Sequence, residues 1–262
     1  MIYILYIYIV KKILYLLMNI CKFLKKAWKN YTWFSMVAMN GEKVDKRFKE
    51  MYADNKNLNN NINFINFILM NIALLGGSFN PITKAHINLA KYVLSSTLNI
   101  NEVWLLPSYT SYNKNLVNSI HRINMCNLAI ENEPNYNIKI SDFEIRNKIE
   151  GSTADVLKEL YKNYDHNFKF IIGMDNANNI FQWSDYKTTL NLIPFIVLDR
   201  IEFKKPNDEW YLYEPHKYIK IDNKENNHVS STLVRNLLKD NKSTEKYLYN
   251  NVYQYIKKFN LF

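Results

Sequence analysis

The residues best suited to chemistry form one short segment, GGSFNPITKAH, which runs from Gly76 to His86. Its two adjacent glycines let the backbone approach a ligand closely, because neither carries a Cβ. The segment leads into a predicted helix, whose first N–H groups and dipole favour phosphate. Thr83 and His86 are three residues apart and would share one face of that helix. The pattern predicts a phosphate site. The plainer alternative is a turn, a capping Thr83 and an exposed His86.

A second candidate phosphate site lies near the C-terminus. Ser230, Ser231 and Thr232 open another predicted helix, where hydroxyl groups can cap the backbone and also meet phosphate oxygens. Arg235 follows Ser231 by four residues and could add a bidentate charged contact from the same face. The alternative is an ordinary helix cap beside a surface arginine. Two such helix starts in one chain favour a ligand with several phosphates.

A third candidate group follows another apolar run. Gly173, Met174 and Asp175 come at its end, and Trp183 follows eight residues after Asp175. An aspartate here could accept hydrogen bonds from ribose hydroxyls or approach a metal, and an indole offers a flat face to an aromatic ring. Taken singly, each has a structural alternative, a helix-capping aspartate and a half-buried tryptophan.

Several familiar sites are excluded by spacing. The glycine pair is followed by no G-K-[ST], and the chain has no G-x-G-x-x-G after its first strand. We find no cysteine and histidine spacing suited to zinc. The two cysteines, Cys21 and Cys126, cannot build a disulfide framework, which fits a reducing compartment.

The predicted elements would bring these groups together. Short apolar runs alternate with segments of helical periodicity from residue 70 onwards, which predicts an α/β fold with a doubly wound, mostly parallel sheet and a helical C-terminus. In such a sheet, ligands lie at the carboxyl ends of the strands, and the unusual residues follow those ends. The expected strands are Ile72–Leu75, Val103–Leu106, Asn137–Ile145, Phe168–Ile172, Pro194–Leu198 and Tyr218–Ile221. The expected helices are Lys84–Ser95, Arg122–Ile130, Thr153–Tyr164, a stretch closing at Leu190–Ile193, and one starting near Ser230.

The charge is unevenly distributed along the chain of 262 residues, whose formal net charge is +10. Residues 1–69 hold 11 basic and 4 acidic residues, whereas residues 70–262 are close to balanced. The basic character therefore belongs to the N-terminal segment, and no nucleic-acid partner is expected. A polar, Asn-rich stretch over 54–63 predicts a boundary. We expect residues 1–69 to be a non-catalytic, partly disordered extension and residues 70–262 to be the catalytic domain.

The first 21 residues form two uncharged, mostly apolar runs, residues 1–10 and 13–21, which are separated by Lys11 and Lys12. A membrane span needs about 18 or more consecutive apolar residues, and a signal peptide has its positive charge before the apolar region. A poor signal anchor, an interfacial amphipathic stretch and a dispensable extension remain open. The expected location is cytoplasmic, with membrane or organelle targeting left open by this segment.

Residues 70–262 resemble the nicotinate/nicotinamide mononucleotide adenylyltransferases, within the nucleotidyltransferase superfamily marked by a (T/H)xxH motif. The resemblance covers nearly three-quarters of the chain and none of residues 1–69, and its motifs occur in the family's order and spacing. They are GGSFNPITKAH, Tyr112-Asn113-Lys114, His121-Arg122 with Met125, GSTADVL from Gly151, Gly173-Met174-Asp175 with Trp183, Arg200 at a strand end, and SSTLVR from Ser230.

The resemblance implies a Rossmann-like fold and adenylyl transfer from ATP to nicotinate or nicotinamide mononucleotide, with Mg²⁺ accompanying ATP. The 5′-phosphate of the mononucleotide is already a nucleophile, so the enzyme must align it and neutralise developing charge. His86 and Thr83 would contact the α-phosphate, and Arg235 would hold the β- and γ-phosphates together with the hydroxyl residues near it. The other ATP or phosphate contacts would be Gly76, Gly77, Ser78, Phe79, Lys114, Asp175, Ser230, Ser231 and Thr232.

The same resemblance places Trp183, Thr153 and Arg200 against the mononucleotide. No dedicated metal cage is expected, because Mg²⁺ would come with the phosphates of ATP. Ser152 replaces a usual Tyr, and Val156 replaces a Thr, so the pyridine pocket could differ in detail. The alternatives are another adenylyltransferase of this superfamily, of the phosphopantetheine type, and a non-catalytic nucleotide-binding protein. The preference between nicotinate and nicotinamide stays open, as does a homo-oligomeric state.

Overall fold

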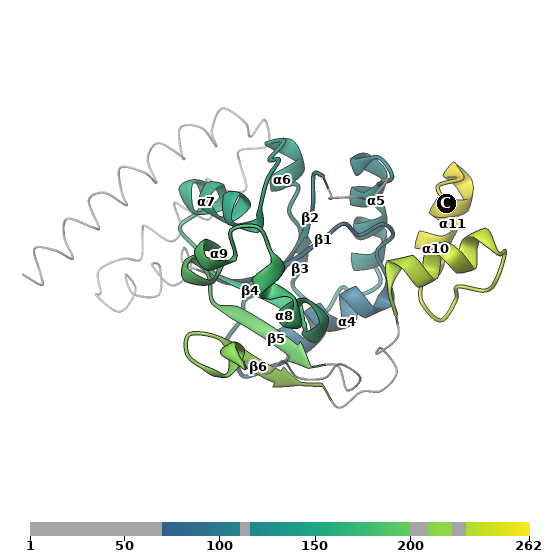
Figure 1. Ribbon diagram of the computed structural model, residues 1–262. Coiled ribbons are helices and arrows are strands. Elements are labelled where there is room, and N and C mark those ends of the chain that lie inside the picture. The colour runs from purple at the N-terminus through teal and green to yellow at the C-terminus, as the bar shows by residue number, and fades with distance from the viewer. Residues whose placement is uncertain (1–69, 111–115, 200–208, 222–228) are drawn as a thin grey trace, which may run out of the picture. The chain divides into compact units, whose positions relative to one another are not determined.

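The core of the protein is one six-stranded parallel sheet. The computed structural model describes residues 70–110, 116–199, 209–221 and 229–262 (Figure 1). Within them, the strand order is β3-β2-β1-β4-β5-β6, and every neighbouring pair runs parallel. The strands are β1 (Asn71–Gly77), β2 (Glu102–Pro107), β3 (Ile138–Ile140), β4 (Asn167–Gly173), β5 (Phe195–Asp199) and β6 (Lys217–Lys220).

The two central strands mark the point where the strand order reverses. Strand β1 pairs with β2 on one side, with Gly77 opposite Pro107, and with β4 on the other side, with Leu75 opposite Ile171. The chain therefore leaves β1 and β4 toward opposite edges of the sheet, and their carboxyl ends border a crevice. Parallel sheets bind ligands in this crevice.

Helices cover both faces of the sheet (Figure 1). Successive residues of β1 point to opposite faces, so Ala73 joins the core under α4, α5, α10 and α11, whereas Leu74 joins the core under α6 to α9. The helices are α4 (Lys84–Leu94), α5 (Ser119–Ile130), α6 (Phe143–Arg146), α7 (Thr153–Asn163), α8 (Met174–Asn178), α9 (Tyr186–Leu192), α10 (Ser231–Lys239) and α11 (Asn250–Phe259), with 3₁₀ turns at Ile180–Gln182 (η1) and Trp210–Leu212 (η2).

Side chains at the helix starts explain why the helices begin there. Ser152 and Asp155 form a capping box at α7, in which each satisfies the other's backbone N–H. The Ser230 hydroxyl accepts from the Leu233 N–H at 3.1 Å and caps α10. Asn118 does the same for α5 through the Ile120 N–H. Each cap therefore fixes the residue at which its helix begins.

The expected fold class is confirmed, including the helical C-terminus, but one expected strand is wrong. The stretch Asn137–Ile145 alternates apolar and polar residues, yet β3 covers only Ile138–Ile140. The pairing with β2 ends with Ile140 opposite Leu105, and the chain then turns. The Arg146 N–H bonds to the Asp142 carbonyl, and a short helix buries Phe143 instead. Local alternation was overridden by a turn at the edge of the sheet.

The expected division at residue 69 stays a prediction, because residues 1–69 lie outside the described part of the chain. Of the helices in the described ranges, none has the length and apolar character needed to cross a membrane.

Candidate active site

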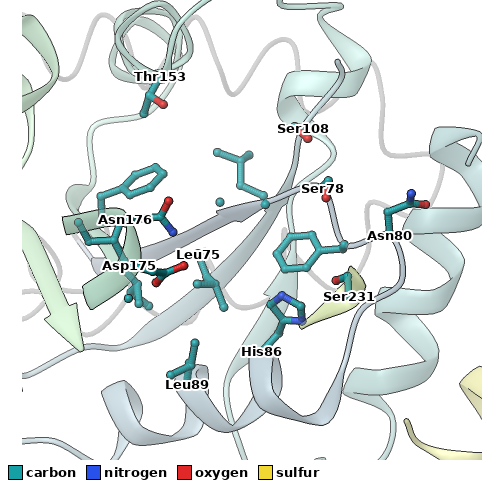
Figure 2. Close-up of a pocket in the computed structure, with 18 of the residues that line it drawn as sticks. Leu75, Ser78, Asn80, His86, Leu89, Ser108, Thr153, Asp175, Asn176 and Ser231 are labelled. Atoms are coloured by element: carbon teal, nitrogen blue, oxygen red, sulfur yellow. The ribbon is translucent and has the colours of Figure 1, made fainter. Parts of the chain in front are cut away.

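A large cavity opens at the carboxyl ends of β1, β2 and β4, with a volume of about 730 Å³ (Figure 2). This is the edge of the sheet where the strand order reverses. Loops after three strands and the first turns of α7, α8 and α10 contribute to its wall. Its polar or glycine lining residues are Gly76, Gly77, Ser78, Asn80, His86, Ser108, Thr110, Glu144, Gly151, Ser152, Thr153, Gly173, Asp175, Asn176, Trp183, Ser230, Ser231, Thr232 and Arg235.

The glycine pair lets the end of β1 form one wall of this cavity. A Cβ at Gly76 would lie 2.7 Å from the Phe170 ring of β4, too close for normal packing. Beyond the pair, Phe79 adopts a left-handed φ of 45° and turns the chain toward α4. The Phe79 ring is buried and meets the His86 ring edge to face, with centroids 5.2 Å apart. The loop thus packs against His86, the side chain with which it was predicted to form a phosphate site.

His86 is held in one orientation by Thr83. The backbone N–H of Thr83 donates to His86 Nδ1 at 3.0 Å, and the Thr83 hydroxyl lies 2.9 Å from the same nitrogen. A backbone N–H is always a donor, so Nδ1 is an acceptor and the neutral ring carries its proton on Nε2. Figure 2 shows the ring rising from α4 toward the loop that carries Ser78. The arrangement gives the cavity a hydrogen-bond donor of fixed direction.

The first turn of α10 is joined to the loop after β1. The Ser231 hydroxyl donates to the Pro81 carbonyl at 2.8 Å. Arg235 donates from one nitrogen to the Asn80 carbonyl at 2.8 Å and from the other to the Thr232 hydroxyl at 3.1 Å. The two predicted phosphate sites are therefore one continuous surface, with both helix N-termini and a guanidinium group on it.

The opposite side of the cavity is formed by residues after β4 and at the start of α7. Asp175 and Asn176 lie in the first turns of α8, and Thr153 stands across from them (Figure 2). Trp183 follows η1 and is partly buried against the core. This side offers an indole, a hydroxyl and a carboxamide, which suit a planar ring with polar substituents.

A buried arginine supports the loops from behind. Arg122 is 1% exposed and donates to the Ser78 carbonyl at 2.8 Å and the Val117 carbonyl at 3.0 Å. Burial lowers the pKa of its guanidinium group. Asn80 adds a second tie, since its side-chain oxygen accepts from the Val117 N–H at 3.2 Å. The connections after β1 and β2 are thereby fastened to each other.

One carboxyl group in the wall has an unusual pKa. Burial raises the pKa of Glu144 to about 7, although the Tyr109 N–H and the nearby Arg122 charge both act to lower it. Desolvation therefore outweighs the stabilising contacts.

The sequence-based prediction of the site is largely reproduced as a spatial cluster. The cavity is lined by Gly76, Gly77, Ser78, Phe79, His86, Thr153, Asp175, Trp183, Ser230, Ser231, Thr232 and Arg235. Thr83 does not line it, but its backbone N–H and its hydroxyl both contact His86 Nδ1. Lys114 and Arg200 lie outside the described residues, so their roles stay predictions.

Several residues that line the cavity were not predicted as site residues from the sequence. Asn80 lies inside the glycine motif, and Asn176 follows Asp175 directly, so their positions could have identified them. Ser108 and Thr110 lie in the loop that directly follows the end of β2. Glu144 was missed because it was placed in a strand.

In the described ranges, no three histidine, cysteine or carboxylate side chains come together. Asp175 and Glu144 are the acidic side chains that line the cavity. A cation that is carried mainly by ligand phosphates needs few protein carboxylates.

Comparison with known proteins agrees with this geometry. The cytidylyltransferase-like family model matches residues 74–237. Fold and site thus define a nucleotidyltransferase of the cytidylyltransferase-like class. A probable nicotinate-nucleotide adenylyltransferase of Caldicellulosiruptor saccharolyticus is 32% identical over 193 residues, covering 71% of this chain and 96% of that protein. The chain belongs to the nicotinate-nucleotide adenylyltransferase family.

Further relatives point the same way. A probable nicotinate-nucleotide adenylyltransferase of Fusobacterium nucleatum is 34% identical over 175 residues, covering 65% of this chain and 89% of the relative. Among solved structures, the Plasmodium falciparum nicotinic acid mononucleotide adenylyltransferase complexed with NaAD aligns with a TM-score of 0.66 and 29% identity. That alignment covers 73% of this chain and 97% of the other.

The contacts of Arg235 predict its contribution to ligand binding. Arg235→Gln removes the charge at the start of α10, and we expect the affinity for MgATP to fall about tenfold to a hundredfold, because charge-assisted hydrogen bonds are lost. Lys239→Gln, at the exposed last turn of the same helix, is the matched control. Isothermal titration measures both, and equal affinities for the two variants would contradict the assignment.

Proposed function

We propose that this protein transfers the adenylyl group of ATP to nicotinate mononucleotide, giving the dinucleotide and pyrophosphate in NAD biosynthesis. The observation that carries the proposal is the single cavity that joins a phosphate-binding side, formed by α4 and α10, to a side suited to a planar ring. The names of the relatives support nicotinate mononucleotide as the acceptor, with nicotinamide mononucleotide as the second candidate.

The phosphate side suits transition-state stabilisation rather than covalent catalysis. The acceptor phosphate attacks the α-phosphorus of ATP, the new P–O bond forms, and the bond to the leaving pyrophosphate breaks. We assign His86 Nε2–H to an α-phosphate oxygen, where negative charge develops. Thr83 holds the ring in the donating tautomer. Arg235 and the first turn of α10 hold the β- and γ-phosphates.

The ring side is assigned to the acceptor. Trp183 stacks on the pyridine ring, and Thr153 lies near its carboxylate. Arg200 is predicted to contact the mononucleotide and Lys114 to add positive charge near the phosphates. Asp175 is placed to accept from a ribose hydroxyl or to approach a cation, by its position at the start of α8.

Mg²⁺ is the expected cofactor, and Asp175 is the residue in the cavity that we assign to it. When bound with ATP, the ion supplies positive charge that stabilises the leaving pyrophosphate. A cytoplasmic location completes the proposal, and it rests on the cysteine content, which fits a reducing compartment.

Pyrophosphate release tests the function directly. The full chain and a chain beginning at Met70 are each given ATP and Mg²⁺ with nicotinate or nicotinamide mononucleotide. We expect turnover by both chains, with the higher kcat/KM for nicotinate mononucleotide. If ATP binds but neither acceptor reacts, the phosphopantetheine-type enzyme and the non-catalytic nucleotide-binding protein become the better explanations. Phosphopantetheine as acceptor separates these two.

The orientation of His86 predicts a selective effect on catalysis. His86→Ala should lower kcat by about two to three orders of magnitude with little change in KM, because the contact strengthens in the transition state. His121→Ala is the control, since His121 bonds to Tyr255 away from the cavity. Steady-state kinetics measures both variants, and an unchanged kcat in His86→Ala would remove this residue from the chemistry.

The position of Trp183 predicts an effect on the acceptor alone. Trp183→Ala should raise KM for the mononucleotide about tenfold, because stacking and burial of the ring are lost. Phe181→Ala is the control, since Phe181 is two residues earlier, 43% exposed and not in the cavity wall. A change confined to KM for ATP would refute the stacking assignment.

A further inference from the structure

Glu144 is a carboxyl group in the cavity wall that the mechanism above does not use. One of its oxygens accepts from the Tyr109 N–H at 2.8 Å, on the loop after β2. Its other oxygen has no hydrogen-bond partner within the described ranges, so this side of the carboxyl group is available to a ligand.

Glu144 lines the same cavity as the residue assigned to the acceptor ring. Its own backbone carbonyl accepts from the Ile149 N–H at 3.0 Å, which closes the turn that leads to Gly151 and the start of α7. Thr153, the first residue of α7, is assigned to the acceptor ring, and both Glu144 and Thr153 are in the cavity wall. The carboxyl group of Glu144 is held by the loop after β2 through the Tyr109 N–H.

The charged groups near Glu144 offset little of the negative charge of its carboxylate. Among the described residues, Arg122 of α5 is the cation whose charge acts on Glu144, and it donates its hydrogen bonds to the backbone carbonyls of Val117 and Ser78. On α6 itself, Arg146 lies 3.8 Å from Asp142, and both side chains are more than half exposed. The pKa of about 7 means that Glu144 is close to half protonated at neutral pH.

We propose that Glu144 is a specificity-determining residue that makes binding of an anionic mononucleotide depend on protonation of its own carboxyl group. This inference rests on the proposed function and adds a regulation of the same site. A neutral carboxyl accommodates the acceptor's negative charges and can also donate a hydrogen bond, whereas the carboxylate repels them. Nicotinate mononucleotide has one more carboxylate than nicotinamide mononucleotide, so it is affected more strongly.

The direction of the pH effect follows from the proton balance. Binding takes up one proton from solution when Glu144 is ionised beforehand. KM for nicotinate mononucleotide therefore stays level below neutrality and rises by up to about tenfold per pH unit above it. The acceptor phosphate also titrates near pH 6, but this contribution is common to all protein variants and cancels in their ratio.

Glu144→Gln is the decisive variant, because glutamine stays neutral and its carbonyl oxygen can still accept from the Tyr109 N–H. Steady-state KM is measured from about pH 6 to about pH 8.5 for both mononucleotides and for ATP. Relative to the wild type, the variant is expected to lose the rise in KM for nicotinate mononucleotide. KM for ATP should keep the wild-type profile.

Glu131→Gln is the matched control, since Glu131 is exposed at the end of α5 and outside the cavity wall. It should follow the wild type at every pH. Parallel profiles for Glu144→Gln and the wild type, or equal effects on both mononucleotides, would overturn the proposal. Absence of turnover with either mononucleotide in the wild type would instead refute the proposed function.

Discussion

The site depends on how the loop after β1 is held. Its backbone carbonyls at Ser78, Asn80 and Pro81 accept hydrogen bonds from Arg122, Arg235 and Ser231, which come from two different helices. A buried polar group without a partner costs about 1–3 kcal/mol, so these donors satisfy a loop that could not otherwise lie so deep. The same three contacts bring α5 and α10 to the cavity. The surface to which we assign phosphate binding thus follows from the need to satisfy one stretch of backbone.

Residues that begin helices also belong to the site. Thr83 precedes α4 and orients His86, Ser230 caps α10, and Ser152 caps α7 while lining the cavity. For these residues, the structural and the functional interpretations of the sequence are compatible. A hydroxyl that accepts one backbone N–H leaves the remaining N–H groups of the first turn directed outward, where an anion can meet them.

Much of the fold was predictable because β1, β2 and β4 contain short apolar runs that end in glycine or proline. The glycine motif and the SSTLVR segment also identified both sides of the phosphate surface. Prediction failed at Asn137–Ile145, where alternation suggested a strand but α6 forms after Ile140. Glu144 was not predicted as a site residue for the same reason. Its raised pKa and its place in the cavity wall arise from burial between segments that are distant in sequence. No single-sequence pattern reports such desolvation.

The parallel sheet also sets a length scale for the reaction. The loops that bear the glycine motif and Asp175 leave adjacent strands, β1 and β4, and such strands lie about 4.8 Å apart. Residues on both loops can therefore contact one ligand at the same time. Hydrogen bonding between the two central strands fixes the distance between these loops, so the spacing of the site is set by the sheet beneath it.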